Sequence, residues 1–155
     1  MVIHIELREV RDEDLPTLYL QQLDPEACAM TAFPPREYED FRAHWDKIRS
    51  VDSNFTNTIL MNEQVAGNIE SWETDGEREV GYWIGKEFWG LGIATSALSE
   101  LLNILPIRPL FAHVAKSNVG SRKVLEKCGF AVSREEKMAL QIGGEEIETC
   151  IFILE

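Results

Sequence analysis

The chain of 155 residues is long enough for one domain with a full hydrophobic core, and its 45% hydrophobic content is ordinary for a globular protein. Its net charge of −12 argues against a nucleic-acid partner, because affinity for phosphate backbones comes mainly from Lys and Arg. Neither a signal peptide nor an apolar window of about 18 residues is evident, so we expect one soluble, cytoplasmic domain over residues 1–155 with no membrane partner.

The first half of the chain predicts one strand, two helices and then three strands. Alternation predicts the strand at 4–8, and a helix follows from about residue 13, with Asp12 as its cap and Pro16 in its first turn. A second helix at 36–50 carries an apolar stripe, which we interpret as core packing: Tyr38, Phe41, Trp45 and Ile48. The three strands are joined by short turns and therefore predict an antiparallel meander: 55–61, 65–72 and 79–84.

The second half predicts a helix, a strand, a helix and two closing strands. The first helix, at 91–105, stops before Pro106. The remaining elements are a strand at 110–115, a helix at 119–128 that Gly129 would end in a left-handed turn, and strands at 131–139 and 147–154 joined at Gly143-Gly144. Seven strands and about four helices predict a single mixed α/β domain.

Neither the cysteines nor the histidines suggest a metal site. The three cysteines are odd in number and lack Cys-x-x-Cys spacing, which indicates neither a disulfide framework nor a zinc site: Cys28, Cys128 and Cys150. The three histidines also lack ligand spacing. We expect reduced thiols and no metal.

Positive charge is concentrated in one part of the chain. Residues 108–137 contain seven Lys or Arg against three Glu, while the rest of the chain contains eight bases against 24 acids. An anionic ligand would prefer the basic segment, and the acidic remainder would attract a cationic co-substrate. A solvated helix face explains the same lysines equally well.

The turn Gly90-Leu91-Gly92 lies between a predicted strand and a predicted helix. Such a turn presents unpaired backbone N–H groups and the positive end of the helix dipole, which suit a phosphate group. The turn lacks the third glycine of a dinucleotide fingerprint, since Thr95 stands there, and it lacks the Gly-Lys-Ser/Thr ending of a nucleotide-binding loop. By itself it is more often a tight turn than a cofactor site.

Two longer segments resemble one known family. They are Gly81-Tyr82-Trp83-Ile84 with Phe88-Trp89-Gly90-x-Gly92-Ile93-Ala94-Thr95, and a second segment in which Asn118, Ser121, Leu125, Lys127, Gly129 and Phe130 share the family spacing. The chain resembles the GNAT family of acyl-CoA-dependent N-acyltransferases, and most closely its RimJ/RimL-like branch of ribosomal-protein alanine/serine N-acetyltransferases. The resemblance implies a seven-stranded, mostly antiparallel sheet of α+β type with splayed central strands, and acetyl-CoA as co-substrate.

The resemblance also implies a set of cofactor-binding residues: Ile84, Trp89, Gly90, Leu91, Gly92, Ile93, Ala94, Asn118, Ser121 and Arg122. The amides of 89–93 would hold the phosphates, and Asn118 and Ser121 would contact the pantetheine and thiol end. Ordinary helix capping explains Asn118 alone, and a surface role explains Arg122 equally well. The chain departs from the family pattern at Glu87, where Gln or Arg is usual, and at Leu125, where many members have a Tyr that protonates the thiolate.

Chemistry on an amine acceptor needs a base and a hydrogen-bond donor for the departing thiolate. Ser121 is the expected donor. Three residues are candidates for the base: Glu70, which alternates with Asn68 and Trp72 on a strand; His113, five residues before Asn118; and Glu146. Exposure on a strand is the plain alternative for Glu70, and a structural role is the plain alternative for His113.

We therefore expect an N-acetyltransferase that moves an acetyl group to a primary amine by direct attack, with no covalent acyl-enzyme, as a monomer or homodimer. The acceptor, which we expect to be cationic, is left open among a protein amino terminus, an aminoglycoside, a polyamine and another small amine. One alternative is a non-catalytic acyl-CoA-binding sensor, suggested by Glu87 and the missing Tyr. A purely interacting domain is the other.

Overall fold

The computed structural model describes residues 2–32, 34–139 and 146–155, which form seven strands, five α-helices and two short 3-10 helices. The strands are β1 (Ile5–Glu9), β2 (Phe55–Met61), β3 (Gln64–Thr74), β4 (Glu77–Ile84), β5 (Leu110–Ala115), β6 (Ala131–Ala139) and β7 (Glu146–Leu154). The helices are η1 (Asp12–Asp14), α1 (Leu15–Gln21), α2 (Pro25–Thr31), α3 (Tyr38–Arg49), η2 (Lys86–Phe88), α4 (Ile93–Ile104) and α5 (Val119–Lys127).

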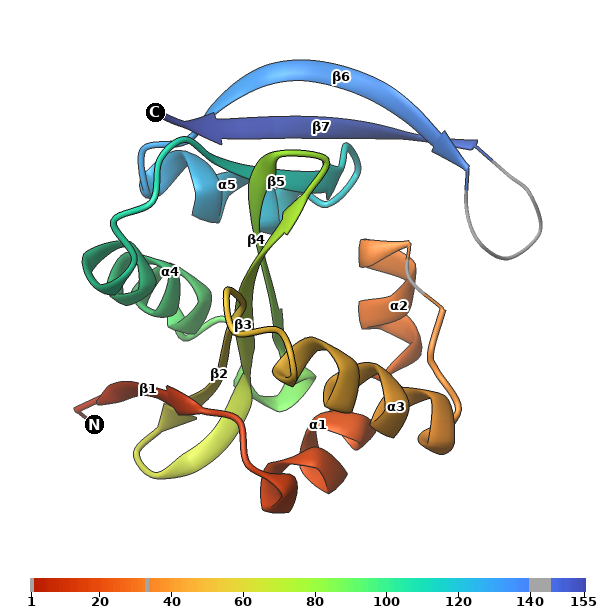
Figure 1. The fold of residues 1–155 in the computed structure, drawn as a ribbon, viewed down its shortest axis with the longest axis vertical. Helices are drawn as coiled ribbons and strands as arrows, with labels where there is room; N and C mark the ends of the chain where they lie inside the picture. Colours follow the sequence, from red (N-terminus) through yellow and green to blue (C-terminus); the bar gives the residue numbers. More distant parts are fainter. Residues whose placement is uncertain (1, 33, 140–145) are drawn as a thin grey trace.

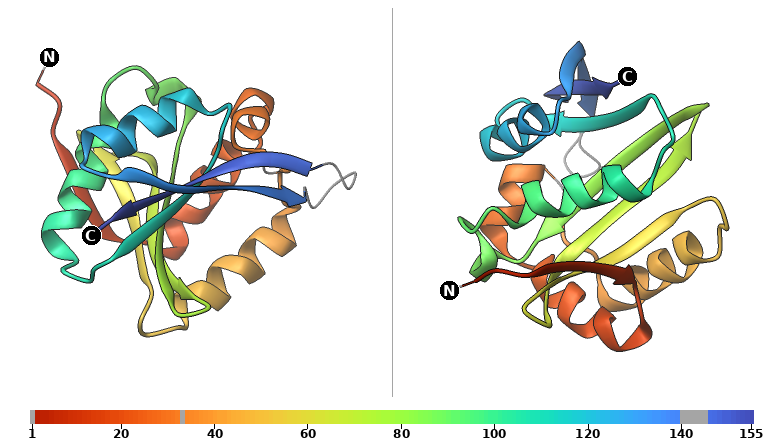
Figure 2. Two further views of the ribbon diagram at one scale, coloured as in Figure 1. Left: turned by 90° about the horizontal axis from the view of Figure 1, so that it is seen from above. Right: turned by 90° about the vertical axis from the view of Figure 1, so that its left-hand side faces the viewer.

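All seven strands belong to one sheet, in the order β1-β2-β3-β4-β5-β7-β6. Every neighbouring pair is antiparallel except β4 and β5, which are parallel. The right-hand view of Figure 2 shows β1 at one edge and the β6–β7 pair at the other. The predicted mixed, mostly antiparallel sheet and its central meander are confirmed.

The parallel pair opens shortly after it begins. Arg78 pairs with Leu110 and Glu79 with Phe111, and β4 and β5 have no register pair beyond these two. Because β4 continues to Ile84 and β5 to Ala115, the two strands diverge over the remainder of their lengths. We call this opening the splay.

Helices cover both faces of the sheet, with α4 and α5 on one face and α1, α2 and α3 on the other (Figure 1). The main core lies under α4 and α5, where Ala97, Leu98 and Leu101 are completely buried and pack against Ile69 and Val80. A smaller cluster lies on the other face, where Phe41 and Trp45 of α3 pack with Leu15 and Leu18 of α1. The predicted α3 stripe is therefore core packing at Phe41 and Trp45, whereas Tyr38 is 41% exposed.

A buried carboxylate connects the amino-terminal segment to the sheet. Asp14 receives two hydrogen bonds from the Arg8 guanidinium, at 2.7 and 2.8 Å, one from the Thr58 hydroxyl at 2.8 Å and one from the Arg11 backbone N–H at 2.9 Å. Burial opposes its charge, but these bonds outweigh burial and lower the pKa of Asp14. The expected cap, Asp12, does not cap α1: the helix begins at Leu15, directly after Asp14, and Asp12 pairs with Arg49 at 2.7 Å.

The sequence prediction missed one helix, α2. Asp24 caps it by accepting the Ala27 N–H at 2.9 Å, and Pro25 occupies its first turn. With only seven residues, α2 is too short for an apolar period to stand out. The bounds of β2, β5 and β6 match the prediction, and Gly129 adopts the expected left-handed conformation at φ +94°. The predicted turn at Gly143-Gly144 lies outside the described residues.

Candidate active site

A glycine loop connects the end of β4 to the start of α4. Gly90 and Gly92 have φ of +78° and +75°, a left-handed conformation that L side chains rarely adopt. A Cβ placed on either glycine would meet no atom within 4 Å, so the space beside the loop is open. Open space at the amino terminus of a 12-residue helix is a suitable place for a phosphate group.

The backbone donors of this loop are partly engaged. Trp89 N–H donates to the Lys86 carbonyl at 3.1 Å, so that amide, expected at the phosphates, is already used. The first bond of the α4 ladder runs from Ser96 N–H to the Gly92 carbonyl at 3.1 Å. The N–H groups of Ile93 and Ala94 therefore precede the ladder and are available to a ligand.

The loop is anchored to its surroundings by two side chains. Trp89 donates from Nε1 to the Ile84 carbonyl at 2.9 Å, which fixes the loop against the end of β4. Lys86 pairs with Glu26 of α2 at 2.7 Å. Glu87, the departure from the family pattern, is exposed, and so is Leu91.

The second expected segment forms the amino terminus of α5. Asn118 caps the helix by accepting the Ser121 N–H at 3.3 Å. Arg122 donates from Nη1 to the Lys116 carbonyl at 3.1 Å, while its buried Nε has no partner among the described residues. Leu125 is completely buried in the core, so the position where many family members carry a Tyr has a packing role here.

A tyrosine that the sequence prediction did not select faces Ser121 across the splay. The Tyr82 hydroxyl of β4 lies 2.6 Å from Ser121 Oγ and 3.4 Å from the Ser121 carbonyl oxygen. Burial raises the pKa of Tyr82 to about 12, although the bond with Ser121 acts in the opposite direction. Tyr82 belongs to the Gly81-Tyr82-Trp83-Ile84 segment, so the motif marked its neighbourhood but gave it no role.

The opposite face of β3 and β4 carries Glu70, directly across from Gly81 in the β3–β4 register. With the Asn68 carboxamide turned so that its nitrogen faces Glu70, the nitrogen lies 2.7 and 2.9 Å from the two carboxylate oxygens. Burial raises the pKa of Glu70 well above its usual range, while the Asn68 contacts favour the charged form. A carboxyl group with a raised pKa suits proton transfer near neutral pH.

The second candidate base, His113, is paired. Its Nε2 lies 3.1 Å from Glu79 Oε1, and the two side chains are 27% and 14% exposed. With Nε2 donating to Glu79, Nδ1 is left as an acceptor. Glu79 was not predicted, because the contact depends on the register between β4 and β5. The third candidate, Glu146, is exposed at the outer end of β7.

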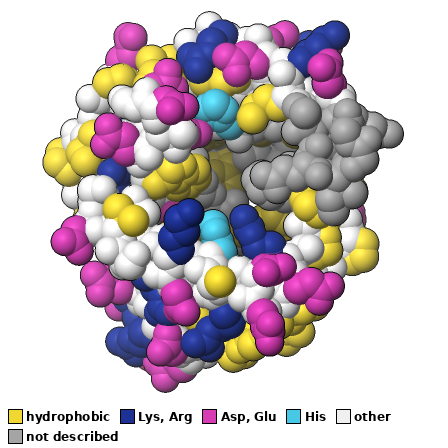
Figure 3. Space-filling view, turned by 45° about the vertical axis from the view of Figure 1, so that its right-hand side comes forward, with side chains coloured by type: hydrophobic (Ala, Val, Ile, Leu, Met, Phe, Trp, Pro, Cys, Tyr) yellow, Lys and Arg dark blue, Asp and Glu magenta, His cyan; other side chains and the backbone are white. Residues whose placement is uncertain are grey.

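This face of the molecule is hollowed. Figure 3 shows the hollow, with Lys, Arg, His, Asp and Glu side chains around its rim. Helix α2 lies against β5 and so closes one side of the region that contains His113. His44 of α3 is half-buried, and burial together with Arg36 and Lys47 lowers its pKa to about 4.

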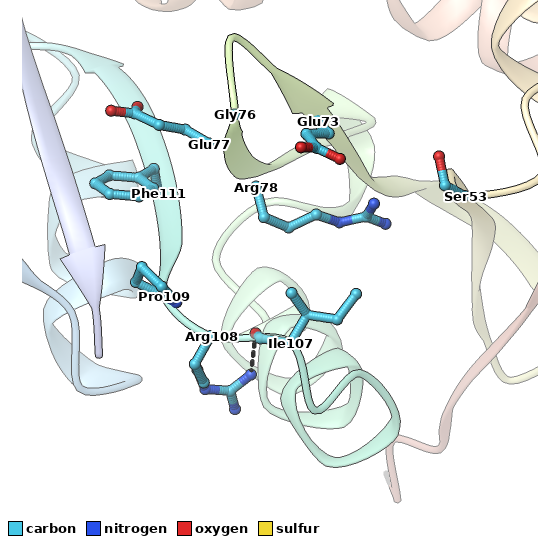
Figure 4. A pocket seen from close by; sticks show the side chains of 9 residues that line it. All are labelled: Ser53, Glu73, Gly76, Glu77, Arg78, Ile107, Arg108, Pro109 and Phe111. Carbon is cyan, nitrogen blue, oxygen red and sulfur yellow. Dashed lines mark hydrogen bonds between the residues drawn. The ribbon is translucent and has the colours of Figure 1, made fainter.

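A cavity of about 380 Å³ opens at the other end of β4 (Figure 4). It is lined by Ser53, Glu73, Gly76, Glu77, Arg78, Ile107, Arg108, Pro109 and Phe111. Arg78 is buried and donates to Ser71 Oγ at 2.9 Å, and Arg108 donates to the Ile107 carbonyl at 2.9 Å. Because β4 and β5 are still paired here, the cavity is separate from the splay.

No group of His, Cys, Asp and Glu in the described ranges is arranged to hold a metal ion. Nor does any of the described helices combine the length and apolar character needed to cross a membrane.

Comparison with known proteins agrees with this geometry. The family described as acetyltransferase (GNAT) domain matches residues 4–131. The chain belongs to this family. The matched residues include the splay, the glycine loop, the start of α5 and both expected motif segments.

Individual relatives extend the comparison. The chain is 28% identical over 112 residues to the Bacillus subtilis protein named "Putative ribosomal N-acetyltransferase YdaF", an alignment that covers 68% of this chain and 59% of the relative. The fold is similar to that of a Vibrio cholerae spermidine N-acetyltransferase in complex with CoA and spermine, with a TM-score of 0.84, 18% identity and coverage of 97% and 94%. It is also similar to that of RimL, a ribosomal L7/L12 α-N-protein acetyltransferase in complex with CoA, with a TM-score of 0.80, 18% identity and coverage of 97% and 93%. The likeness to YdaF agrees with the RimJ/RimL-like branch, and the two solved structures share the fold.

Proposed function

We propose that this protein transfers an acetyl group from acetyl-CoA to a primary amine by direct attack in a ternary complex. The observation that carries the proposal is the splay, with a glycine loop and a helix amino terminus at its edge and polar side chains on both of its faces. Family membership supports the reaction class. When bound, acetyl-CoA supplies an acetyl thioester.

The cofactor would be held mainly by backbone groups. The amides of Gly90, Leu91, Gly92, Ile93 and Ala94 are assigned to the phosphates, and the end of β4 at Ile84 to the pantetheine arm. On the other side, we assign Arg122 and the cap residue Asn118 to the cofactor. Glu87 is exposed and so need not face the phosphates.

On the acceptor face, the protein must remove a proton from the amine. We assign this role to Glu70, because it lies on β3 next to the diverging strand β4 and burial raises its pKa well above the usual range of a carboxyl. The His113–Glu79 pair is the alternative base on the same face. Ser121, from the α5 side, is assigned the hydrogen bond to the departing thiolate.

Two acceptor classes are suggested by the relatives. The Vibrio cholerae structure contains a polyamine, and YdaF and RimL are named for ribosomal substrates. We propose a primary amine of one of these two classes. Its attraction to the protein is favoured by the overall charge of −12 if the acceptor is cationic.

The test is free-thiol release from acetyl-CoA, measured with a panel of polyamines and peptides with free amino termini, alongside the thermal shift caused by acetyl-CoA alone. We expect stabilisation by acetyl-CoA and thiol release with at least one amine. Stabilisation without thiol release across the panel would favour an acyl-CoA-binding sensor. If acetyl-CoA neither stabilises the protein nor releases thiol with any amine, the proposal is wrong.

A further inference from the structure

Two hydroxyl groups meet across the splay, and one of them has no role so far. The Tyr82 hydroxyl lies 2.6 Å from Ser121 Oγ. Tyr82 comes from β4 and Ser121 from the first turn of α5, so this contact joins two elements that the diverging strands would otherwise leave apart.

The chemistry of the two groups sets the direction of the bond. A phenol, with an ordinary pKa of about 10, is a stronger donor than an aliphatic hydroxyl, and the aliphatic oxygen is the better acceptor. The other acceptor near Tyr82, the Ser121 carbonyl oxygen, is more distant at 3.4 Å. The phenol proton therefore lies on the short bond to Ser121 Oγ. Because burial raises the pKa of Tyr82 to about 12, the phenol keeps that proton throughout the neutral range.

This direction determines what Ser121 can do. A hydroxyl that accepts one hydrogen bond still has its own proton to donate, and accepting the first bond strengthens the second. If Ser121 donated to Tyr82 instead, its proton would be used and none would remain for a ligand.

We propose that Tyr82 is a positioning residue for the acetyl transfer: it donates to Ser121 Oγ and so leaves the Ser121 proton free to bond the sulfur of the departing CoA. The inference rests on the proposed function. The carbon–sulfur bond breaks with its electron pair on sulfur, the amine nitrogen forms the new bond to the acetyl carbon, and the amine proton goes to the base on the opposite face. The sulfur leaves as a thiolate held by the Ser121 O–H and is later protonated by water.

Tyr82 matters for this role because Leu125 has no hydroxyl to offer the thiolate. The position that carries the usual tyrosine in many family members is packed in the core of this protein and offers no O–H. Tyr82 supplies a phenol from β4, and it acts through Ser121.

A kinetic double-mutant cycle tests the coupling. Tyr82→Phe keeps the ring and removes the hydroxyl, and we expect kcat to fall roughly ten- to a hundredfold while the KM for acetyl-CoA changes less than about threefold. Ser121→Ala should lower kcat at least as much, and the double variant should be no slower than Ser121→Ala alone. Ser121→Thr, which retains the hydroxyl, should recover part of the rate. Unchanged kcat in Tyr82→Phe, or losses that multiply in the double variant, would overturn the proposal.

A second measurement needs no turnover. The thiol of bound CoA, titrated by its thiolate absorbance, should ionise at lower pH than free CoA in the unaltered protein, and Tyr82→Phe and Ser121→Ala should both reverse this shift. Tyr19→Phe, another half-buried tyrosine but one in α1, is the matched control and should leave the titration unchanged. A lower melting temperature with an unshifted thiol titration would show that Tyr82 merely ties β4 to α5. Because the titration requires only CoA binding, it still decides this inference if no amine is acetylated and the proposed function fails.

Discussion

The two faces of the sheet at the splay differ in whether backbone groups or side chains supply their polar atoms. On the α4–α5 face, the groups assigned to the cofactor are mainly backbone groups: two left-handed glycines, the N–H groups that begin α4, and a capped α5. On the α1–α3 face, the polar groups are side chains from separate strands, with Glu70 beside Asn68 and His113 beside Glu79.

The difference has a physical basis. A phosphate-bearing ligand can be bound by N–H groups that any residue supplies, provided that the backbone has the right conformation. Proton removal from an amine needs a particular side chain with an adjusted pKa, and that adjustment comes from burial and neighbours. Substitutions on the first face should therefore change cofactor affinity, whereas substitutions on the second should change turnover and its pH dependence.

The largest effect is expected for Glu70→Gln. Removal of the assigned base should lower kcat about 10²- to 10⁴-fold with little change in acetyl-CoA affinity. Because the base acts deprotonated and burial raises its pKa, the rate of the unaltered protein should rise with pH through a limb above the usual carboxyl range, and this limb should disappear in the variant. Glu73→Gln, at an exposed position on the same strand, is the control. Full activity with an unaltered limb would place the base elsewhere.

Next in size is the cofactor loop. Gly92→Val should weaken acetyl-CoA binding about tenfold or more in calorimetry, because the side chain would fill the space assigned to the phosphates. Gly76→Val is a matched control, since Gly76 also has a left-handed φ, +80°, and open space around its Cβ, but lies in the β3–β4 turn. Both variants carry the same backbone strain, so equal losses of affinity would mean that strain alone explains the result.

His113→Gln should have a smaller effect, with kcat lowered less than about tenfold and the pH limb retained, if Glu70 is the base. Glu79→Gln should resemble it, because both substitutions break the same 3.1 Å contact. A pH–rate profile that becomes flat in His113→Gln, while Glu70→Gln keeps its limb, would exchange the roles of the two residues.

The smallest effect is expected at Glu87. Glu87→Gln removes a negative charge beside the amino terminus of α4, and acetyl-CoA binding should tighten about two- to fivefold at low salt, with the gain shrinking as salt is added. Glu100→Gln, also exposed but within α4, serves as the control. If the Glu87→Gln variant and the unaltered protein bind acetyl-CoA equally well at every salt concentration, Glu87 does not affect phosphate binding.

Those parts of the fold that depend on local pattern could be predicted from the sequence. Strand patterns gave β2, β5 and β6 with their bounds, short turns gave the antiparallel meander, and the glycine at the end of α5 gave its left-handed terminator. The missed helix α2 has a local signal, the Asp24-Pro25 start, but its seven residues are too few to show an apolar period. Asp12 and Asp14 are both good caps by type, but the Asp14 carboxylate is used by Arg8 and Thr58 and makes no side-chain bond to α1, which the local sequence does not reveal.

The site was predictable to the same extent. The glycine loop and the Asn118 cap are local and were found. Tyr82 and Glu79 were not, because their partners, Ser121 and His113, lie 39 and 34 positions away in the chain and are brought near by the splay and by strand register. The burial that raises the pKa of Glu70 is likewise a product of packing from several elements.

The two register pairs that join β4 to β5 have a mechanical consequence. Strands β5, β7 and β6 are paired with the first four strands only through these two register pairs, and the shared core under α4 and α5 and the Tyr82–Ser121 and Glu79–His113 contacts hold the two parts of the sheet together. A ligand bound in the splay would contact both β4 and β5 and would stabilise their association where no strand pairing holds them. The free energy of local opening at the splay would then depend on the ligand concentration as well as on the sequence of the protein.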